Sequence, residues 1–328
     1  MGTLSGPAEG RYPSPHTRYQ VRDEEDVGAA RRAAGRMAAA AGLGHAEAEI
    51  VAAELAMNIL RRASGHGYLL CQAGPGYLEL VAADHGPGLG PGVGLASVRR
   101  LASEFDYCSG PAGTVILARF GDPRRSWAGL ARWGAVNVPL GGAGESGDAW
   151  LVAADDCRLA AFVVDGLGHG PGAAAASAAA VSALAGRPVT DPADCVLRAH
   201  EAMRGTRGGV LGIAVIDPGL GELVYAGVGN IAGWVLHGGT NRGLLSREGV
   251  AGTQARPPRP HLTKVRWQAG ATLILASDGI RTLRDLRSYR GLFGHDPAVA
   301  AAVLCRDHER GTDDATMLVI QDVRRGES

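Results

Sequence analysis

The sequence is poor in cysteine, and its cysteines do not fall into pairs. There are five of them, an odd number scattered along the chain without a Cys-x-x-Cys spacing. Disulfide frameworks and structural zinc sites both need paired or closely spaced cysteines. The sequence therefore implies neither, and a reducing cytoplasm is the compartment that we expect.

An excess of charge of either sign is also absent. The chain of 328 residues carries 33 basic and 33 acidic residues, so its formal net charge is zero. Binding to nucleic acids or to anionic membranes relies on a positive excess. We therefore expect proteins or small molecules as partners, with no nucleic acid and no membrane.

Long apolar runs are missing as well. The alanine-rich segment 173–185 is bounded by Gly172 and Gly186 and is too short to span a bilayer. Residues 1–18 contain prolines and glycines but no apolar core, so they do not form a signal peptide. We predict a soluble protein in which residues 1–18 are a disordered tail.

The length of the chain suggests roughly two domains of about 150 residues each. Between residues 120 and 136 neither a strand nor a helix period is evident, so we predict a linker at 121–135 between domains at 19–120 and 136–325. The first domain is predicted to be α+β. Its expected helices are 27–41, 46–63 and 93–104, and its expected strands are 68–72, 77–82 and 114–120.

The second half is dominated by strand patterns. A hairpin of strands 149–154 and 159–164 is followed by two predicted helices, one after Gly172 and one from Asp191 to about Met203. Further strands are expected at 210–216, 222–226, 231–237, 272–276 and 315–320. Two adjacent helices beside many strands predict a sandwich of sheets flanked by helices.

Acidic residues stand at the ends of several of these strands. Asp165 opens the stretch Asp-Gly-Leu-Gly-His-Gly, and Asp278 lies in Ser-Asp-Gly. Asp148 begins one strand, and Asp313 lies just before another. Any one of them can be an ordinary turn residue. If they converge, however, they supply the oxygen ligands that magnesium and manganese prefer.

Two divalent cations about 4 Å apart would bind phosphate oxygens and activate a water for in-line attack on phosphorus. The pattern of acidic strand ends therefore favours hydrolysis of phosphomonoesters.

These motifs resemble those of a known family. They are Ser146-Gly-Asp148, Asp165-Gly-Leu-Gly-His-Gly170, Gly227-Val-Gly-Asn230, Ser277-Asp-Gly279 and Asp313-Asp-Ala-Thr316. Over about residues 136–323 the chain is similar to the SpoIIE branch of the PPM-type (type 2C) metal-dependent serine/threonine phosphatases. The resemblance implies an αββα sandwich with a centre of two Mn2+ or Mg2+ ions.

The resemblance also implies roles for individual residues. Asp165 and the carbonyl of Gly166 would bind or bridge the metals, and Asp278 and Asp313 would complete the site. Asp148 matches an upstream acidic residue of the branch. Asp165 and Asp278 would carry the catalysis.

Three further residues of these motifs leave alternatives open. Asp314 is the alternative ligand to Asp313. His169 and Asn230 lie in family motifs, but a hydrogen-bonded histidine and an asparagine that caps a loop are alternative interpretations of them.

The first half contains a second group of candidate residues. Glu54 and Asn58 are four apart in a predicted helix, so they share a face. They are either a solvated pair or a general base and a magnesium ligand. Downstream lie the glycine-rich stretches with Asp84, Gly86 and Gly88, then Gly92 and Gly94, and finally Gly113-Thr114.

Together these residues resemble the N, G1 and G2 boxes of the GHKL (Bergerat) ATPase fold, in particular RsbT-like switch kinases, over about residues 19–120. The resemblance implies an ATP site in which Asp84 binds the adenine amino group, Asn58 holds magnesium and Glu54 is the base. In that family a long lid separates the two glycine boxes, whereas here Gly88 and Gly92 nearly adjoin. The short connection should weaken ATP binding and phosphoryl transfer.

Taken together, the two resemblances predict a protein phosphatase that acts on a phosphorylated STAS-domain regulator, an anti-sigma antagonist, in a partner-switching pathway. The N-terminal domain would then serve mainly for docking. One alternative is a bifunctional switch with an active N-terminal kinase. Another is a scaffold without enzymatic activity.

Overall fold

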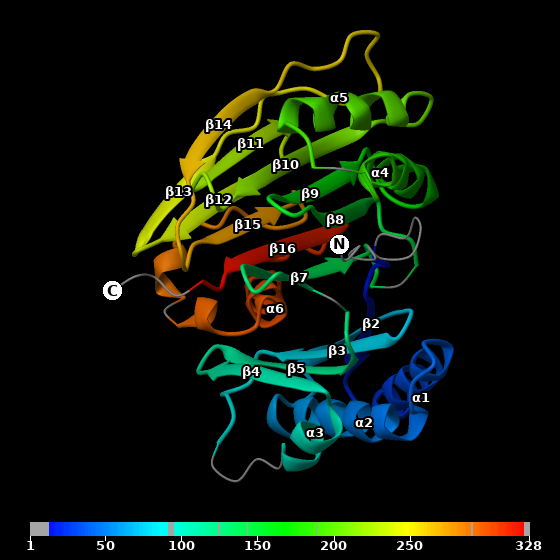
Figure 1. The fold of residues 1–328 in the computed structure, drawn as a ribbon. Helices are drawn as coiled ribbons and strands as arrows, with labels where there is room; N and C mark the ends of the chain where they lie inside the picture. The colour runs from blue at the N-terminus through cyan, green and yellow to red at the C-terminus, as the bar shows by residue number, and fades with distance from the viewer. Residues whose placement is uncertain are drawn as a thin grey trace.

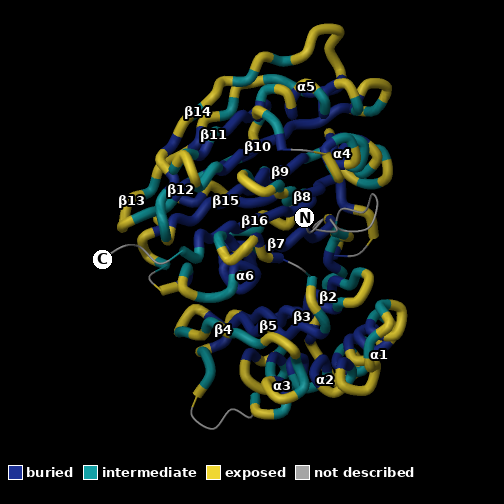
Figure 2. Tube along the Cα trace, viewed as in Figure 1, coloured by how far each residue is buried: buried dark blue, intermediate teal, exposed yellow. Residues whose placement is uncertain are grey.

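Three antiparallel sheets are stacked on one another, with helices between and outside them (Figure 1). The computed structural model describes residues 13–90, 95–123, 125–142, 144–187, 189–289 and 291–324. We call the sheets, in chain order, the N-terminal, the middle and the outer sheet. Most of their strand positions are buried, whereas exposed positions gather in loops and on the outer helices (Figure 2). Among the described residues, no helix is long and apolar enough to cross a membrane.

The N-terminal sheet has the strand order β1-β2-β3-β5-β4. Its strands are β1 (Thr17–Val21), β2 (Gly67–Gly74), β3 (Tyr77–Asp84), β4 (Glu104–Gly110) and β5 (Gly113–Gly121). One face is covered by α1 (Glu24–Ala40), α2 (His45–Arg62) and α3 (Ala96–Leu101) (Figure 1). On α2, Val51, Leu55 and Ile59 recur every four residues and are buried in the core against this face.

The middle and outer sheets form a sandwich. The middle sheet consists of β13 (Thr240–Leu244), β12 (Ala232–His237), β15 (Thr272–Ala276), β16 (Ala315–Asp322), β7 (Ala131–Val138) and β6 (Ser126–Trp127). The outer sheet consists of β14 (His261–Arg266), β11 (Glu222–Val228), β10 (Gly209–Asp217), β9 (Leu159–Gly166) and β8 (Asp148–Ala154). Their facing side chains, including Trp150, Tyr225 and Leu273, share one core.

Helices cover both outer faces of this sandwich. The outer sheet is covered by α4 (Pro171–Leu184) and α5 (Pro192–Met203). The middle sheet is covered by α6 (Pro297–His308), which is preceded by the short 3-10 turns η1 (Leu286–Ser288) and η2 (Leu292–Gly294). The predicted αββα order of the second half is therefore confirmed.

Helix α6 also packs against the N-terminal sheet. Every residue from Ala298 to Cys305 is buried. One core contains this helix, Leu70 and Leu117 of the N-terminal sheet, and Val136 and Met317 of the middle sheet. Close packing of a helix between two sheets requires small side chains, and α6 is rich in alanine. The two halves of the chain therefore share a continuous core.

Several predicted elements agree with the structure, and others do not. Helices α1 and α2, strands β2, β3 and β5, and the hairpin of β8 and β9 lie where the sequence predicts them. The predicted helix 93–104 is wrong at its C-terminal end, because α3 ends at Leu101 and Glu104 begins strand β4. Residues 93 and 94 lie outside the described part. Strands β1, β4, β6, β7, β13 and β14 and helix α6 are additional to the prediction.

Two predicted boundaries need correction. The predicted tail extends to residue 18, but His16 is buried and Thr17 begins β1. Residues 1–12 lie outside the described part of the chain. The predicted linker at 121–135 contains strand β6 and the start of strand β7, both of which pair within the middle sheet. The chain therefore enters the sandwich before residue 136.

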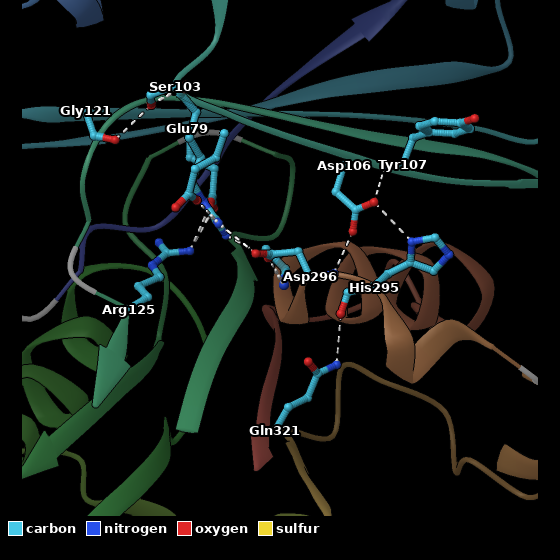
Figure 3. Close-up of polar contacts among 12 residues, drawn as sticks. Glu79, Ser103, Asp106, Tyr107, Gly121, Arg125, His295, Asp296 and Gln321 are labelled. Carbon is cyan, nitrogen blue, oxygen red and sulfur yellow. Dashed lines mark hydrogen bonds and ion pairs between the residues drawn. The ribbon is translucent and has the colours of Figure 1, made fainter. Parts of the chain in front are cut away.

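A buried ion-pair network connects the N-terminal sheet to the start of α6 (Figure 3). Glu79 of β3 is fully buried, and it accepts hydrogen bonds from Arg119 Nε at 2.6 Å and from Arg125 Nη1 at 2.9 Å. Arg119 also pairs with Asp296, the N-cap of α6, at 2.9 Å. Asp106 of β4 accepts a hydrogen bond of 2.6 Å from the backbone N–H of Asp296. The charged groups of both halves are therefore paired across this junction.

Replacement of Glu79 tests the importance of this network. We expect Glu79→Gln to lower the free energy of unfolding by about 3–5 kcal/mol, because Arg119 and Arg125 would keep buried charges with too little compensation. Urea unfolding measures the difference. In the control Glu201→Gln the altered side chain is 54% exposed and 3.8 Å from Arg204, so a change below about 0.5 kcal/mol is expected. Equal, small changes in both variants would contradict this account of the junction.

The same network predicts that the free energy of unfolding depends on pH. Burial alone would raise the pKa of Glu79, but attraction by Arg125 and Arg119 outweighs it and holds the pKa well below its usual range. The pKa of Glu79 is thus lower in the folded state than in the unfolded state, where it is about 4.3. The stabilisation that Glu79 contributes is therefore complete above about pH 4.3 and is lost as the pH falls through the folded pKa. We therefore expect the stability gap between the unaltered chain and Glu79→Gln to shrink below about pH 4, measured by urea unfolding. A gap that is constant with pH would count against this.

Candidate metal centre

The outer sheet carries the first acidic side chains of the site. Strand β9 ends with Asp165 and Gly166, and Asp165 pairs with Asp148 on β8. Directly opposed residues of an antiparallel pair project to the same face, so both aspartates are on one side of the sheet. Ser277, which follows β15 of the middle sheet, donates a hydrogen bond of 2.6 Å to Asp148 Oδ2. The shared side therefore faces the middle sheet.

A cavity of about 310 Å³ opens at this edge of the sandwich. Its wall is formed by Asp165, Leu167, Gly168, Val210, Gly229, Asn230, Glu248, Gly249, Asp278 and Asp313. The structure thus brings Asp165, Asp278 and Asp313 together from three separate parts of the chain. A larger cavity of about 400 Å³ lies at the junction with the N-terminal sheet instead. Arg119 and Asp296 in that wall are already paired with each other, so its chemistry is that of the ion-pair network.

Asp278 is held by neighbours on both sides. Asn230, which follows β11, donates a hydrogen bond of 2.8 Å from Nδ2 to Asp278 Oδ2. On the other side, a Cβ at Gly279 would lie 2.0 Å from the carbonyl oxygen of Asp314. Only glycine allows the two loops to approach this closely. Asn230 therefore orients a carboxylate of the cavity, a role that its family motif alone did not define.

Two of the acidic residues lie behind the cavity wall. Asp148 is 4% exposed and Asp314 is 3% exposed. Asp314 accepts hydrogen bonds from the backbone N–H groups of Leu140 at 2.6 Å and Gly147 at 2.7 Å. Asp313 faces the cavity. Asp314 instead links its own loop by hydrogen bonds to the segment that contains Leu140 and Gly147.

Gly166 lies where the outer sheet meets helix α4. Its N–H donates to the carbonyl of Gly147 at 3.0 Å. A Cβ at this position would be 2.2 Å from the carbonyl oxygen of Ala173. Glycine at 166 thus sets the close approach of the Asp165 loop to the start of α4.

Like charges are crowded around Asp165. Burial raises the pKa of Asp165, and repulsion from Asp148, Asp278 and Asp313 raises it further. Burial also raises the pKa of Asp148, although the hydrogen bond from Ser277 opposes the shift. A bound divalent cation would relieve this repulsion.

The residues at the cavity fit magnesium or manganese. Within the described ranges, no three His, Cys, Asp or Glu side chains are close enough to form a ligand cluster by themselves. Magnesium keeps several of its waters and binds through one or two carboxylates, so it does not need such a cluster. Carboxylate and carbonyl oxygens suit Mg2+ and Mn2+ better than Zn2+. The donors that the cavity offers are Asp165, Asp278 and Asp313, with Gly166 and Asp148 adjacent.

The predicted nucleotide residues of the first half lie together only in part. Asp84 Oδ1 accepts hydrogen bonds from the backbone N–H groups of Gly86 at 2.8 Å and Thr114 at 3.3 Å. A Cβ at Gly88 would be 2.8 Å from the carbonyl of Gly110. These residues form one corner beside the end of α2.

Glu54 and Asn58, which also belong to the predicted nucleotide site, are not part of this corner as described. Ser97 of α3 donates a hydrogen bond of 2.5 Å to the carboxylate of Glu54. Asn58 lies one turn further along α2 and is partly buried. Gly92 and Gly94 lie outside the described residues, so their prediction is not tested.

Two residues of the metal site were not predicted. Ser277 stands in the motif Ser277-Asp-Gly279, but the sequence assigns it no role of its own. Glu248 lies in the irregular segment 245–260 between β13 and β14, where no periodic pattern marks it. His169, for which a hydrogen-bonded histidine is one interpretation, is an exposed loop residue.

The packed sheets, the flanking helices and the acidic strand ends around one cavity define a PPM-type phosphatase fold. Comparison with known proteins identifies the family. The family model of stage II sporulation protein E (SpoIIE) matches residues 155–328, just over half of the chain. The chain therefore belongs to the SpoIIE family, and the predicted class of metal-dependent serine/threonine protein phosphatase is confirmed.

Individual relatives agree with this family. The phosphoserine phosphatase RsbX of Bacillus subtilis (strain 168) is 28% identical over 144 residues, which are 44% of this chain and 71% of RsbX. A chain from a structural study of the bacterial stressosome is 26% identical, with a TM-score of 0.54, over 58% of this chain and 98% of that one. RsbX in complex with magnesium has the same fold, with 22% identity, a TM-score of 0.53, and coverage of 60% and 98%.

Gly166→Ala tests the close approach between β9 and α4. We expect this variant to be destabilised by about 1–3 kcal/mol, because the added methyl group would force the strand end and the helix apart. The control is Gly294→Ala, where a Cβ would meet nothing within 4 Å. Thermal unfolding of both variants decides the point. A Gly166→Ala variant as stable as the control would show that the approach is not tight.

Proposed function

We propose that the chain removes phosphate from serine or threonine of a STAS-domain regulator in a partner-switching pathway. The observation that carries the proposal is the convergence of Asp165, Asp278 and Asp313 on one cavity. RsbX is a phosphoserine phosphatase, and another similar chain comes from a structural study of the bacterial stressosome. Both similarities support a phosphoprotein substrate of this signalling type.

The residues of the cavity would have different roles in this reaction. Two Mn2+ or Mg2+ ions bound there would supply electrophilic activation of the phosphate and of the attacking water. Asp165, with the Gly166 carbonyl beside it, would hold the ions from the outer sheet, and Asp278 and Asp313 would hold them from the middle sheet. Asn230 keeps Asp278 turned towards the cavity. Asp148 is buried behind Asp165 and accepts a hydrogen bond from Ser277. It would thereby fix the position of Ser277, which directly precedes Asp278.

The N-terminal part, about residues 19–120, is in our proposal an RsbT-like GHKL domain that docks the regulator. Two features support this. Three helices cover one face of its five-stranded antiparallel sheet, and Asp84, Gly86 and Thr114 meet at one corner of it. The phosphatase domain would begin at strand β6 (Ser126–Trp127), before the predicted boundary at residue 136, and extend to about residue 325.

Loss of the acidic side chains tests the phosphatase. We expect the chain to release inorganic phosphate from a phosphorylated STAS-domain protein only when Mn2+ or Mg2+ is present. Asp165→Asn and Asp278→Asn should abolish this release, and Asn230→Ala should lower it by about 10- to 100-fold, because Asn230 only orients a ligand. A malachite-green phosphate assay measures all of these.

The matched control is Asp156→Asn, which removes an exposed carboxylate in the turn between β8 and β9. Its turnover should equal that of the unaltered chain. Equal turnover by Asp165→Asn, or turnover without any divalent metal, would refute the mechanism.

ATP binding by the N-terminal part is a separate test. With the short connection between Gly88 and Gly92, we expect ATP with magnesium to bind weakly, in the millimolar range or above, and no phosphate to be transferred to the regulator. Calorimetric titration and a radiolabel transfer assay measure this. Tight binding with transfer of phosphate, both lost in Asn58→Ala, would favour the bifunctional kinase and phosphatase instead.

A further inference from the structure

The guanidinium of Arg207 lies across the glycine-rich loop that follows Asp165. Arg207 Nη1 is 3.5 Å from the carbonyl oxygen of His169. A Cβ at Gly172 would lie 2.6 Å from Arg207 Nε, and a Cβ at Gly168 would lie 3.4 Å from Arg207 Nη1. The side chain is therefore packed against both glycines. Gly168 belongs to the wall of the acidic cavity, so the guanidinium lies at the rim of that cavity.

The backbone on either side of Arg207 is held in place. The N–H of Leu167 donates to the carbonyl of Gly208 at 3.0 Å. Thr206 Oγ1 accepts from the N–H of Gly208 at 3.0 Å. Directly after this turn, Gly209 pairs with Gly166 at the start of β10. The loop that carries Arg207 is thus fixed to the Asp165 loop before any ligand binds.

The cavity wall is acidic, so the positive charge of Arg207 is complementary to an anionic substrate in a way that the wall is not. The charged residues in the cavity wall are Asp165, Glu248, Asp278 and Asp313, all of them acidic. A phosphomonoester is an anion, and apart from metal ions bound there the wall as described offers it no cationic side chain. Throughout the described part of the chain, Arg207 has no carboxylate partner, and its one hydrogen bond goes to a backbone carbonyl. Its donors are therefore available to a ligand.

Arg247 is the other arginine to consider, because it precedes Glu248 of the wall. Its Nη1 donates to the carbonyl of Arg259 at 3.3 Å, along the segment 245–260. That contact directs the guanidinium of Arg247 to the backbone of Arg259. The guanidinium of Arg207, by contrast, lies against Gly168 of the cavity wall. Arg207 is therefore the better candidate for contact with a ligand in the cavity.

We infer that Arg207 binds the phosphate group of the substrate at the rim of the cavity and positions it beside Asp165. A guanidinium forms paired hydrogen bonds with phosphate oxygens, which fix the orientation of the group as well as its location. Gly168 and Gly172 lack side chains and so leave the space that the guanidinium occupies. The inference rests on the proposed phosphatase function, and it adds the residue that recognises the phosphate.

Steady-state kinetics with a phosphoserine peptide and Mn2+ test the inference. We expect Arg207→Ala to raise both KM and the inhibition constant of inorganic phosphate by about 10- to 100-fold, the usual value of a charge-assisted hydrogen bond. Arg207→Lys should restore only part of the loss, since a lysine cannot form the paired contact. Calorimetric affinity for Mn2+ should be unchanged. The control Arg204→Ala removes an exposed arginine of the same loop and should leave every constant unchanged.

Gly172→Ala provides an independent test that keeps the arginine. The three atoms nearest to the added Cβ all belong to Arg207, so the guanidinium must move. Position 172 is in the first turn of α4, where alanine is a better helix former than glycine. We therefore expect a stable fold, with KM raised as in Arg207→Ala. The double variant should show no further increase, because both changes remove one interaction.

The outcomes separate the inference from the function on which it rests. No metal-dependent turnover by the unaltered chain would refute the proposed function, and the inference with it. Normal turnover together with an unchanged phosphate inhibition constant in Arg207→Ala would overturn the inference alone. Additive losses in the double variant would also overturn it, since Gly172→Ala would then act by another route.

Discussion

Repulsion among carboxylates crowded at one edge of the sandwich, some partly and some fully buried, is the constraint on which the site depends. Asp165, Asp278 and Asp313 share a small cavity, with Asp148 directly behind them. Hydrogen bonds from Ser277 and Asn230 hold two of these carboxylates in place. Burial and repulsion together raise the pKa of Asp165, so the site favours binding of protons or, better, of divalent cations. The fold thereby maintains an unfavourable arrangement of charge that a metal ion stabilises.

Helix α6 relates this site to the N-terminal sheet. At its N-terminus Asp296 pairs with Arg119, and after its C-terminus the N–H of Arg310 donates to the carbonyl of Gly279 at 2.8 Å, next to Asp278. Arg306, near the end of the helix, donates to the carbonyl of Asp84 at 3.3 Å. The helix is buried over most of its length between two sheets. Helix α6 and the residues that directly follow it thus contact both the Asp84 corner and the loop that carries Asp278.

The sequence marks acidic residues that line the cavity, whereas several elements of the fold around them escape it. Asp165 and Asp278 are marked by the glycines that follow them, and the structure places both with Asp313 in the wall of one cavity; their role as metal ligands stays a prediction. Helix α6 is missed because it is buried on all sides, and its run of alanine and valine has no polar face to show a helical period. Strand β7 is missed because its partner β16 lies far along the chain, with Val138 paired to Ala315. Strand β6 is only two residues long and pairs with β7. Glu248 and Arg207 depend on contacts between distant loops, which no local pattern reveals.

Calorimetric titration of Mn2+ into the unaltered chain and into Asp165→Asn is the measurement that tests the central claim most directly. The account predicts saturable binding of two ions by the unaltered chain, and loss of that binding in the variant, whose fold should remain intact because the substitution preserves the shape of the side chain. Binding of no ion by the unaltered chain, or equal binding by both, would contradict the assignment of this cavity as the metal centre of a phosphatase.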